Sequence, residues 1–195
     1  KSAGEFLRVQ LLIDKGFHPL AYRLMCLQAH YRSELEFSWE GLIAAFTRLK
    51  RMVMAVVPLR DAAPACEVTD KGLVDLFAKF DAAISDDLNT AIALTALEET
   101  LSLKKIDQGE KLLALAQMDA VLGLNLLQIE RANLRVRPRS QTIQETEIEA
   151  ALAQRKEARA KKDFATSDRI RNDLIAKGVE VMDGDPLGWD WRIEV

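Results

Sequence analysis

The apolar positions along the first two thirds of the chain recur at the spacing of amphipathic helices. Phe6, Val9 and Ile13 fit one helix face, and another face follows the break at "KGFHP". A longer stripe then consists of Leu42, Ala45, Phe46, Leu49, Val53 and Val56. It runs from Ser38, a residue type that caps helix N-termini, to Pro58. These stripes predict helices that pack through one side.

The same pattern continues after a loop that ends at Asp70. A further stripe consists of Leu73, Leu76, Phe77, Phe80 and Ile84. Two more helices are expected over residues 88–106 and 109–122, the second closing at Gly123. Together these stripes predict the core of a helical bundle.

The helical pattern is lost over residues 126–144, which we interpret as a linker. Two short helices follow, separated by "KKD", and the second closes at Gly178. The ending "VEVMDGDPLGWDWRIEV" alternates like two strands around a turn. The predicted fold class is therefore mainly α: a helical bundle, followed by a small helical hairpin with a terminal β-hairpin.

Composition narrows the functional classes. The chain has no uninterrupted apolar run of about 18 residues and no signal-peptide pattern, so no contact with a membrane is expected. Cys26 and Cys66 lie far apart without ligand-like neighbours, which favours unpaired thiols in a reducing compartment. The net charge of −3 excludes a protein coated in basic residues, but it leaves room for a local basic patch.

Such a patch lies within residues 155–171, where seven basic residues stand against three acidic ones, a local balance of +4. Phe164 lies among them, at the bend of the helical hairpin. Cations for phosphates and an aromatic ring for stacking are what single-stranded RNA requires. The alternative is a solvated helix pair with Phe164 in its small core. Trp189 and Trp191 share one strand face, where they either stack on bases or cover the core.

Other candidate chemistry is sparse. His18 and His30 have no neighbouring nucleophile and no ligand spacing, so neither a metal site nor a catalytic histidine is expected. The segment "HYRS" could form a fixed hydrogen-bond network, and "SDDLNT" supplies an N-cap to the next helix. The sequence contains no Gly-rich phosphate loop and no nucleophile elbow.

Several segments, taken in order, resemble the C-terminal part of the cysteinyl-tRNA synthetase family. They are "KSAGEF", "AHYRSELEFS", "DDLNT" and "ARAKKDFATSDRIRNDLIAKGVEVMDGDPLGWDWR". The resemblance covers essentially the whole chain. It implies that Lys1 and Ser2 are the last two letters of the "KMSKS" signature loop, in which the lysine stabilises the triphosphate charge during adenylation and the serine helps to order the loop.

The resemblance also implies a division of labour. The full cytoplasmic enzyme would activate cysteine with ATP and transfer it to tRNA(Cys). ATP and zinc would be bound by an N-terminal catalytic half, so this segment should hold no cofactor and be inactive alone. Four parts are expected: residues 1–35 as the end of the signature loop and a stem-contact connection, 36–125 as a bundle of the DALR type, 126–144 as a linker, and 145–195 as the anticodon domain.

The family's anticodon contacts carry over to four positions of the helical hairpin: Arg159, Phe164, Asp168 and Arg171. Phe164 stands where the family often has Trp, and the tail "LGWDWRIEV" is less polar than usual. An acidic residue before the terminal turn also takes part. Counting from Gly178 indicates Asp183, whereas counting back from Pro186 indicates Asp185, and both stay open.

Two alternatives belong to other functional classes. The cysteine ligase of mycothiol synthesis shares the front and the bundle of this architecture but uses no tRNA, and the basic hairpin counts against it. A non-catalytic helical interaction module would show no preference for one tRNA.

Overall fold

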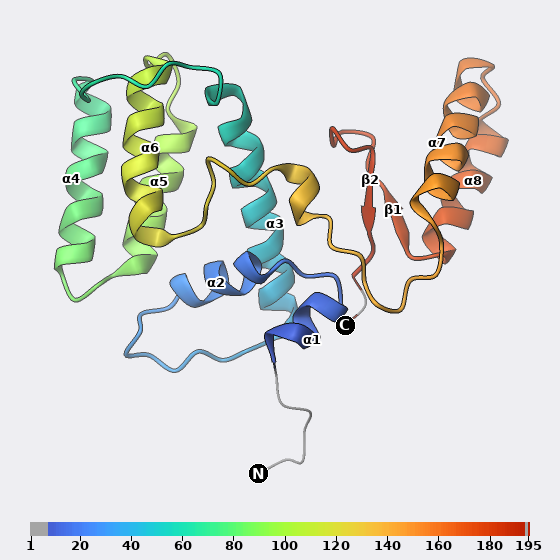
Figure 1. Cartoon of the computed structure of the whole chain (residues 1–195), viewed down its shortest axis with the longest axis horizontal. Helices are drawn as coiled ribbons and strands as arrows, with labels where there is room; N and C mark the ends of the chain where they lie inside the picture. Colours follow the sequence, from blue (N-terminus) through green and yellow to red (C-terminus); the bar gives the residue numbers. More distant parts are fainter. Residues whose placement is uncertain (1–7, 194) are drawn as a thin grey trace, which may run out of the picture. The chain divides into compact units, whose positions relative to one another are not determined.

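The computed structural model describes residues 8–193 and 195, and it divides into two compact units (Figure 1). We call residues 19–131 the helical unit. The hairpin unit combines the N-terminal residues up to His18 with residues 132–195. The expected signature-loop residues Lys1 and Ser2 lie outside the described residues. Among the described residues, no helix is both long and apolar enough to cross a membrane.

The helical unit forms the predicted bundle. Its elements are α2 (Pro19–Leu27), α3 (Trp39–Val56), the short 3₁₀ helix η1 (Val57–Leu59), α4 (Lys71–Ser85), α5 (Thr90–Ser102) and α6 (Gln108–Leu122). Neighbours along the chain pack on one another, α2 on α3, α4 on α5 and α5 on α6. The apolar stripe of α3 is buried along its whole length, which confirms that it belongs to the core.

Local sequence explains where these helices begin. The caps of α3 to α6 are Ser38, Asp70, Asn89 and Asp107. Each side chain accepts a hydrogen bond from a backbone N–H of the first turn, which would otherwise lack a partner. Helix α6 ends at Gly123, whose φ of 64° is a left-handed conformation that glycine adopts without steric cost.

The hairpin unit contains the predicted helical and β-hairpins. Its elements are α1 (Val9–Asp14), α7 (Glu145–Ala160), α8 (Phe164–Ala176), β1 (Val179–Val181) and β2 (Trp189–Trp191). Helices α7 and α8 pack together, and the antiparallel strands pair Val179 with Trp191 and Val181 with Trp189. The predicted fold class is thereby confirmed.

The hairpin unit has a small apolar core. Its buried members are Ile143, Ile148, Ile170, Leu174, Val179, Val181, Trp189 and Trp191. The two tryptophan rings meet edge to face, with their centroids 5.0 Å apart. Both are therefore core residues, and stacking on bases is not their role in this arrangement. Phe164 does not belong to the core.

Residues 126–144, predicted to be a linker, contain several buried side chains. Leu134, the last residue of the short 3₁₀ helix η2 (Arg131–Leu134), is fully buried. In the next residues, the guanidinium of Arg135 lies 3.8 Å from the ring centroid of Trp189, and that of Arg137 lies 5.5 Å from the ring of Trp191. Two arginines that lie two residues apart in this segment thus face two tryptophans that lie two residues apart in β2.

Candidate nucleic-acid interface

Phe164 is presented to solvent at the start of α8. Asp163 caps this helix, its carboxylate accepting a hydrogen bond from the backbone N–H of Thr166 at 3.0 Å. Lys162, just before the cap, adopts a left-handed φ of 61° that turns the chain sharply from α7 into α8. As a result Phe164 is 62% exposed. The alternative that placed Phe164 in the hairpin core is wrong, because that core is filled from the other faces of the two helices.

The remaining hairpin positions singled out by the sequence are exposed as well. Asp168 and Arg171 follow Phe164 on α8 at spacings of four and seven residues, which places all three on one helix face. Arg159 lies near the end of α7, with half of its side chain exposed. An exposed ring, two cations and a carboxylate are thus distributed over the surface of the two helices.

The turn between β1 and β2 brings a carboxylate to this surface. Nη1 of Arg155 donates to Oδ1 of Asp183 at 2.7 Å, and Nη2 donates to Oδ2 at 3.1 Å. Nη1 of Arg159 also donates to Oδ2 of Asp183, at 3.2 Å. Arg155 and Arg159 lie four residues apart on α7, so both reach the same point beside the helix. The arrangement is a carboxylate shared by two guanidinium groups.

Electrostatics keeps this carboxylate ionised. The hydrogen bonds and charge of Arg155, with a smaller contribution from Arg159, lower the pKa of Asp183 to about 2. In turn the contact with Asp183 raises the pKa of Arg155, and the charge of Asp168 on α8 adds to that effect. Asp168 therefore belongs to the same electrostatic cluster, although no direct hydrogen bond joins it to Arg155.

Asp183 and Asp185, both left open by the sequence, take different places. Oδ1 of Asp185 accepts a hydrogen bond from the backbone N–H of Leu187 at 2.9 Å, so this carboxylate holds the turn itself. Asp183 instead points to the arginines of α7. Both carboxylates border a groove of about 390 Å³ between α7 and the β-turn. Its lining residues are Leu152, Arg155, Lys156, Arg159, Val181, Met182, Asp183, Asp185 and Gly188.

Sequence reasoning counted Arg155 among the basic residues but assigned it no site. In the structure its side chain is only 9% exposed and makes the two-point contact with Asp183. The available signal was its spacing of four residues from Arg159, which puts two arginines on one side of α7. The sequence could not indicate their shared partner, which lies 28 residues further along the chain.

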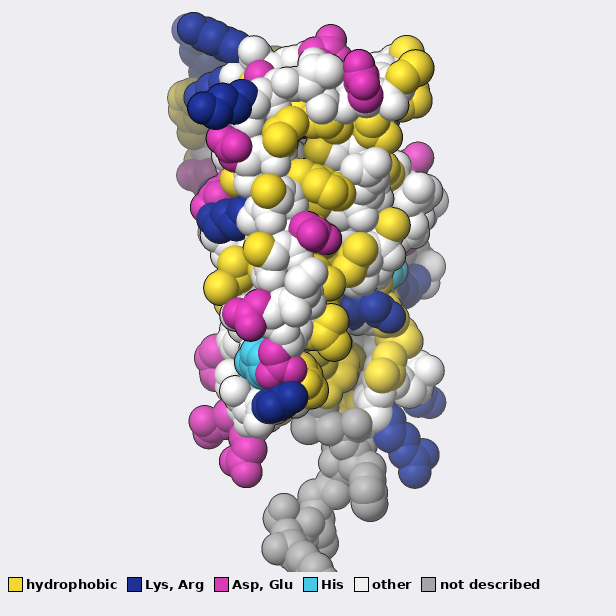
Figure 2. Space-filling model, turned by 90° about the vertical axis from the view of Figure 1, so that its left-hand side faces the viewer, with side chains coloured by type: hydrophobic (Ala, Val, Ile, Leu, Met, Phe, Trp, Pro, Cys, Tyr) yellow, Lys and Arg dark blue, Asp and Glu magenta, His cyan; other side chains and the backbone are white. Residues whose placement is uncertain are grey.

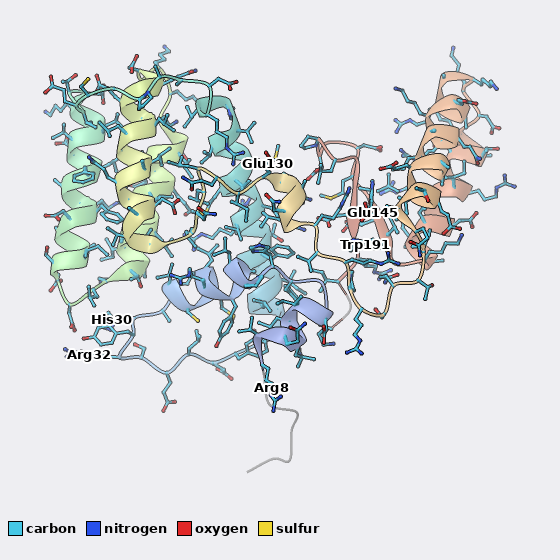
Figure 3. All side chains as sticks on the ribbon, viewed as in Figure 1. Arg8, His30, Arg32, Glu130, Glu145 and Trp191 are labelled. Atoms are coloured by element: carbon cyan, nitrogen blue, oxygen red, sulfur yellow. The ribbon has the colours of Figure 1, made fainter. Side chains whose placement is uncertain are left out.

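The "HYRS" and "SDDLNT" segments meet in the helical unit. The hydroxyl of Tyr31 donates to Oδ1 of Asp87 at 2.7 Å, and Arg32 pairs with the same oxygen at 3.0 Å. The ring of His30 stacks on Tyr31, with Nε2 3.7 Å from Oδ2 of Asp87. Figure 3 shows His30 and Arg32 on the loop after α2. Asp87 has a left-handed φ of 54°, so this network fixes a strained turn between α4 and α5.

Within the described residues, no group of three or more His, Cys, Asp or Glu side chains is arranged to hold a metal ion. Cys26 and Cys66 are free and exposed, so Cys26 does not lie on the buried side of its helix. A groove of about 350 Å³ is lined by residues 66–68 together with residues of α4 and α6, and most of these residues are apolar. Figure 2 shows apolar side chains lying between charged ones over this face.

Known proteins are similar to this chain, including the segment that carries this interface. A family model described as the cysteinyl-tRNA ligase anticodon binding domain matches residues 145–192. The chain is 64% identical over 194 residues to a cysteine–tRNA ligase of Novosphingobium aromaticivorans, which is 99% of this chain and 39% of the relative. A cysteine–tRNA ligase of Zymomonas mobilis is 44% identical over 226 residues, covering 100% of this chain and 44% of that relative. The chain thus spans about two fifths of the length of these curated relatives.

Proposed function

Because the chain belongs to the cysteine–tRNA ligase family, of which it represents the C-terminal part, we propose that it supplies tRNA recognition to an enzyme that charges tRNA(Cys). Residues 145–195 bind the anticodon in this proposal. The observation that carries it is the exposed ring of Phe164 on a basic hairpin, inside the segment that matches an anticodon-binding family.

The side chains divide the work of recognition between them. Phe164 stacks on an unpaired base, because its ring is exposed and every base offers a face for stacking. Arg159 and Arg171 bind phosphates or base acceptors, and Asp168 accepts from base amino groups. Asp183 also accepts from a base, since its carboxylate stays ionised at neutral pH. Asp185 takes no direct part, because its carboxylate is used to hold the turn.

The rest of the enzyme's chemistry lies elsewhere in this proposal. Cysteine activation with ATP and zinc binding belong to an N-terminal half, which is the partner of this segment. The described residues do not fit a zinc site. In the proposal residues 1–35 supply the end of the signature loop and the stem-contact connection. Lys1 and Ser2, which lie outside the described residues, act there on the ATP phosphates. Residues 36–125 form a bundle of the DALR type and 126–144 join it to the anticodon domain. In this proposal the enzyme acts in the cytoplasm.

Binding of the purified chain to tRNA(Cys) and to the same tRNA with a swapped anticodon tests the function. Both are measured at one moderate salt concentration, because phosphate contacts make all RNA affinities salt-dependent. We expect clear preference for the native anticodon. Equal, weak and salt-sensitive binding to both would reduce the hairpin to a generic basic surface. No binding at all would favour a ligase that uses no tRNA, or an interaction module.

A further inference from the structure

The two arginines that share Asp183 hold it in different ways. Arg155 makes two parallel contacts, of 2.7 and 3.1 Å, and its side chain is only 9% exposed. Arg159 makes a single contact of 3.2 Å with a side chain that is 50% exposed. A two-point contact fixes both the position and the plane of a carboxylate, whereas a single exposed contact fixes neither.

We propose, building on the anticodon-binding function above, that Arg155 is a positioning residue that orients the Asp183 carboxylate for base recognition. Arg159, in contrast, leaves Asp183 when RNA binds and contacts the RNA instead. Arg155 contacts no RNA itself in this arrangement. It acts through the carboxylate, which it holds at the border of the groove between α7 and the β-turn.

Burial is the first reason for this division. Arg155 is buried on α7, and its Nε has no hydrogen-bond partner. Both of its terminal nitrogens are occupied by Asp183. Replacing these contacts by an RNA phosphate would leave Asp183 with only the single exposed contact from Arg159, beside the incoming negative charge. Arg159 can leave Asp183 at less cost, because solvent already screens its single contact.

Charge state is the second reason. The hydrogen bond from Arg155 is the chief cause that lowers the pKa of Asp183 to about 2, so Arg155 is the main group that stabilises the ionised, acceptor-only carboxylate. Base amino and imino groups are donors, and a fixed ionised acceptor distinguishes them from base carbonyl oxygens. A freely rotating carboxylate would pay conformational entropy on binding and would discriminate less.

The test is a comparison of Arg155→Gln, Arg155→Lys and Arg159→Gln in the full chain. Affinity is measured for tRNA(Cys) and for three variants of it, each with one anticodon nucleotide changed, over a range of salt. For Arg155→Gln we expect about a tenfold loss of discrimination at one nucleotide position, with an unchanged salt slope. Arg155→Lys keeps a buried charge but lacks the planar fork, so it should lose discrimination as well.

Arg159→Gln should behave differently. It should weaken binding to all four tRNAs alike and reduce the salt slope by about 0.7 to 0.9, the value for one lost phosphate contact. Arg169→Gln, which removes an exposed arginine from α8, is the matched control and should leave the discrimination unchanged. Far-UV circular dichroism and melting of each variant confirm that the hairpin unit is folded.

A double-mutant cycle with Asp183→Asn decides whether Arg155 acts through the carboxylate. In that background Arg155→Gln should cause no further loss of discrimination. An equal loss in both backgrounds, a lower salt slope for Arg155→Gln, or retained discrimination in a folded Arg155→Gln or Arg155→Lys chain would each overturn the inference. If the unaltered chain shows no preference among the four tRNAs, the proposed function itself fails, which is a distinct result.

Discussion

Replacing Phe164 by Ala separates RNA stacking from a role in folding. Phe164 is 62% exposed, so a little over a third of its surface is covered by protein. Full burial of a phenylalanine is worth roughly 1.5–3 kcal/mol, and partial burial in proportion amounts to about 1 kcal/mol or less. We therefore expect Phe164→Ala to lower the free energy of unfolding by at most about 1 kcal/mol. A core Phe→Ala change costs about 3–5 kcal/mol.

The same substitution should lower the affinity for tRNA by more free energy than it lowers the stability of the fold. One base–aromatic stack contributes about 1–3 kcal/mol, so the affinity for tRNA(Cys) should fall by about five- to 150-fold. Because stacking accepts any base, most of this loss should also be seen with an anticodon-swapped tRNA that still binds. Urea unfolding gives the stability change, and fluorescence anisotropy of labelled tRNA gives the affinity change.

A matched control lies on the same helix. Ile170 is 9% exposed and belongs to the core of the hairpin unit, so Ile170→Ala should cost about 2–5 kcal/mol of stability. The reasoning about Phe164 is refuted if Phe164→Ala destabilises the chain as much as Ile170→Ala does. It is also refuted if a folded Phe164→Ala chain binds tRNA with unchanged affinity.

Three further predictions concern stability. The Asp119 carboxylate accepts hydrogen bonds from the backbone N–H groups of Leu124 at 3.0 Å and Leu126 at 2.7 Å. Asp119→Ala should therefore lower the free energy of unfolding, measured in urea, by about 2–4 kcal/mol. A loss below about 1 kcal/mol would contradict this account. Arg135→Ala removes the guanidinium from the ring of Trp189 and should lower the free energy of unfolding by about 1–2 kcal/mol. It should also change the tryptophan fluorescence, and an unaltered spectrum would argue against the contact. Because the pKa of Asp183 is lowered from 3.8 to about 2, its stabilising contribution is present above pH 3.8 and is lost as the pH falls towards 2. Solvent screening limits this contribution to about 1 kcal/mol, and a smaller acid-induced loss of stability in Asp183→Asn than in the unaltered chain would verify it.

Much of the fold could be predicted from local patterns. The stripe that starts after Ser38 became α3, and the expected helix over 109–122 became α6, ending at Gly123 as predicted. Boundaries were less accurate: the helix expected over 88–106 is α5, Thr90–Ser102. Asn89 caps it, and Leu88, which has a left-handed φ of 53°, cannot belong to it. The predicted division into four parts, and the roles of the anticodon residues, remain predictions.

The sequence by itself determined the helices, the basic hairpin and the family resemblance, because periodicity, caps and charge are encoded within a few neighbouring residues. Only the tertiary structure decided which aromatic rings face outward. Phe164 and Trp189 are both large and apolar, but Phe164 is exposed whereas Trp189 is buried in the core of the hairpin unit. It also decided that Asp183, and not Asp185, meets the arginines of α7. That choice depends on how the β-turn directs each side chain across 28 residues of sequence, and no short-range pattern records it.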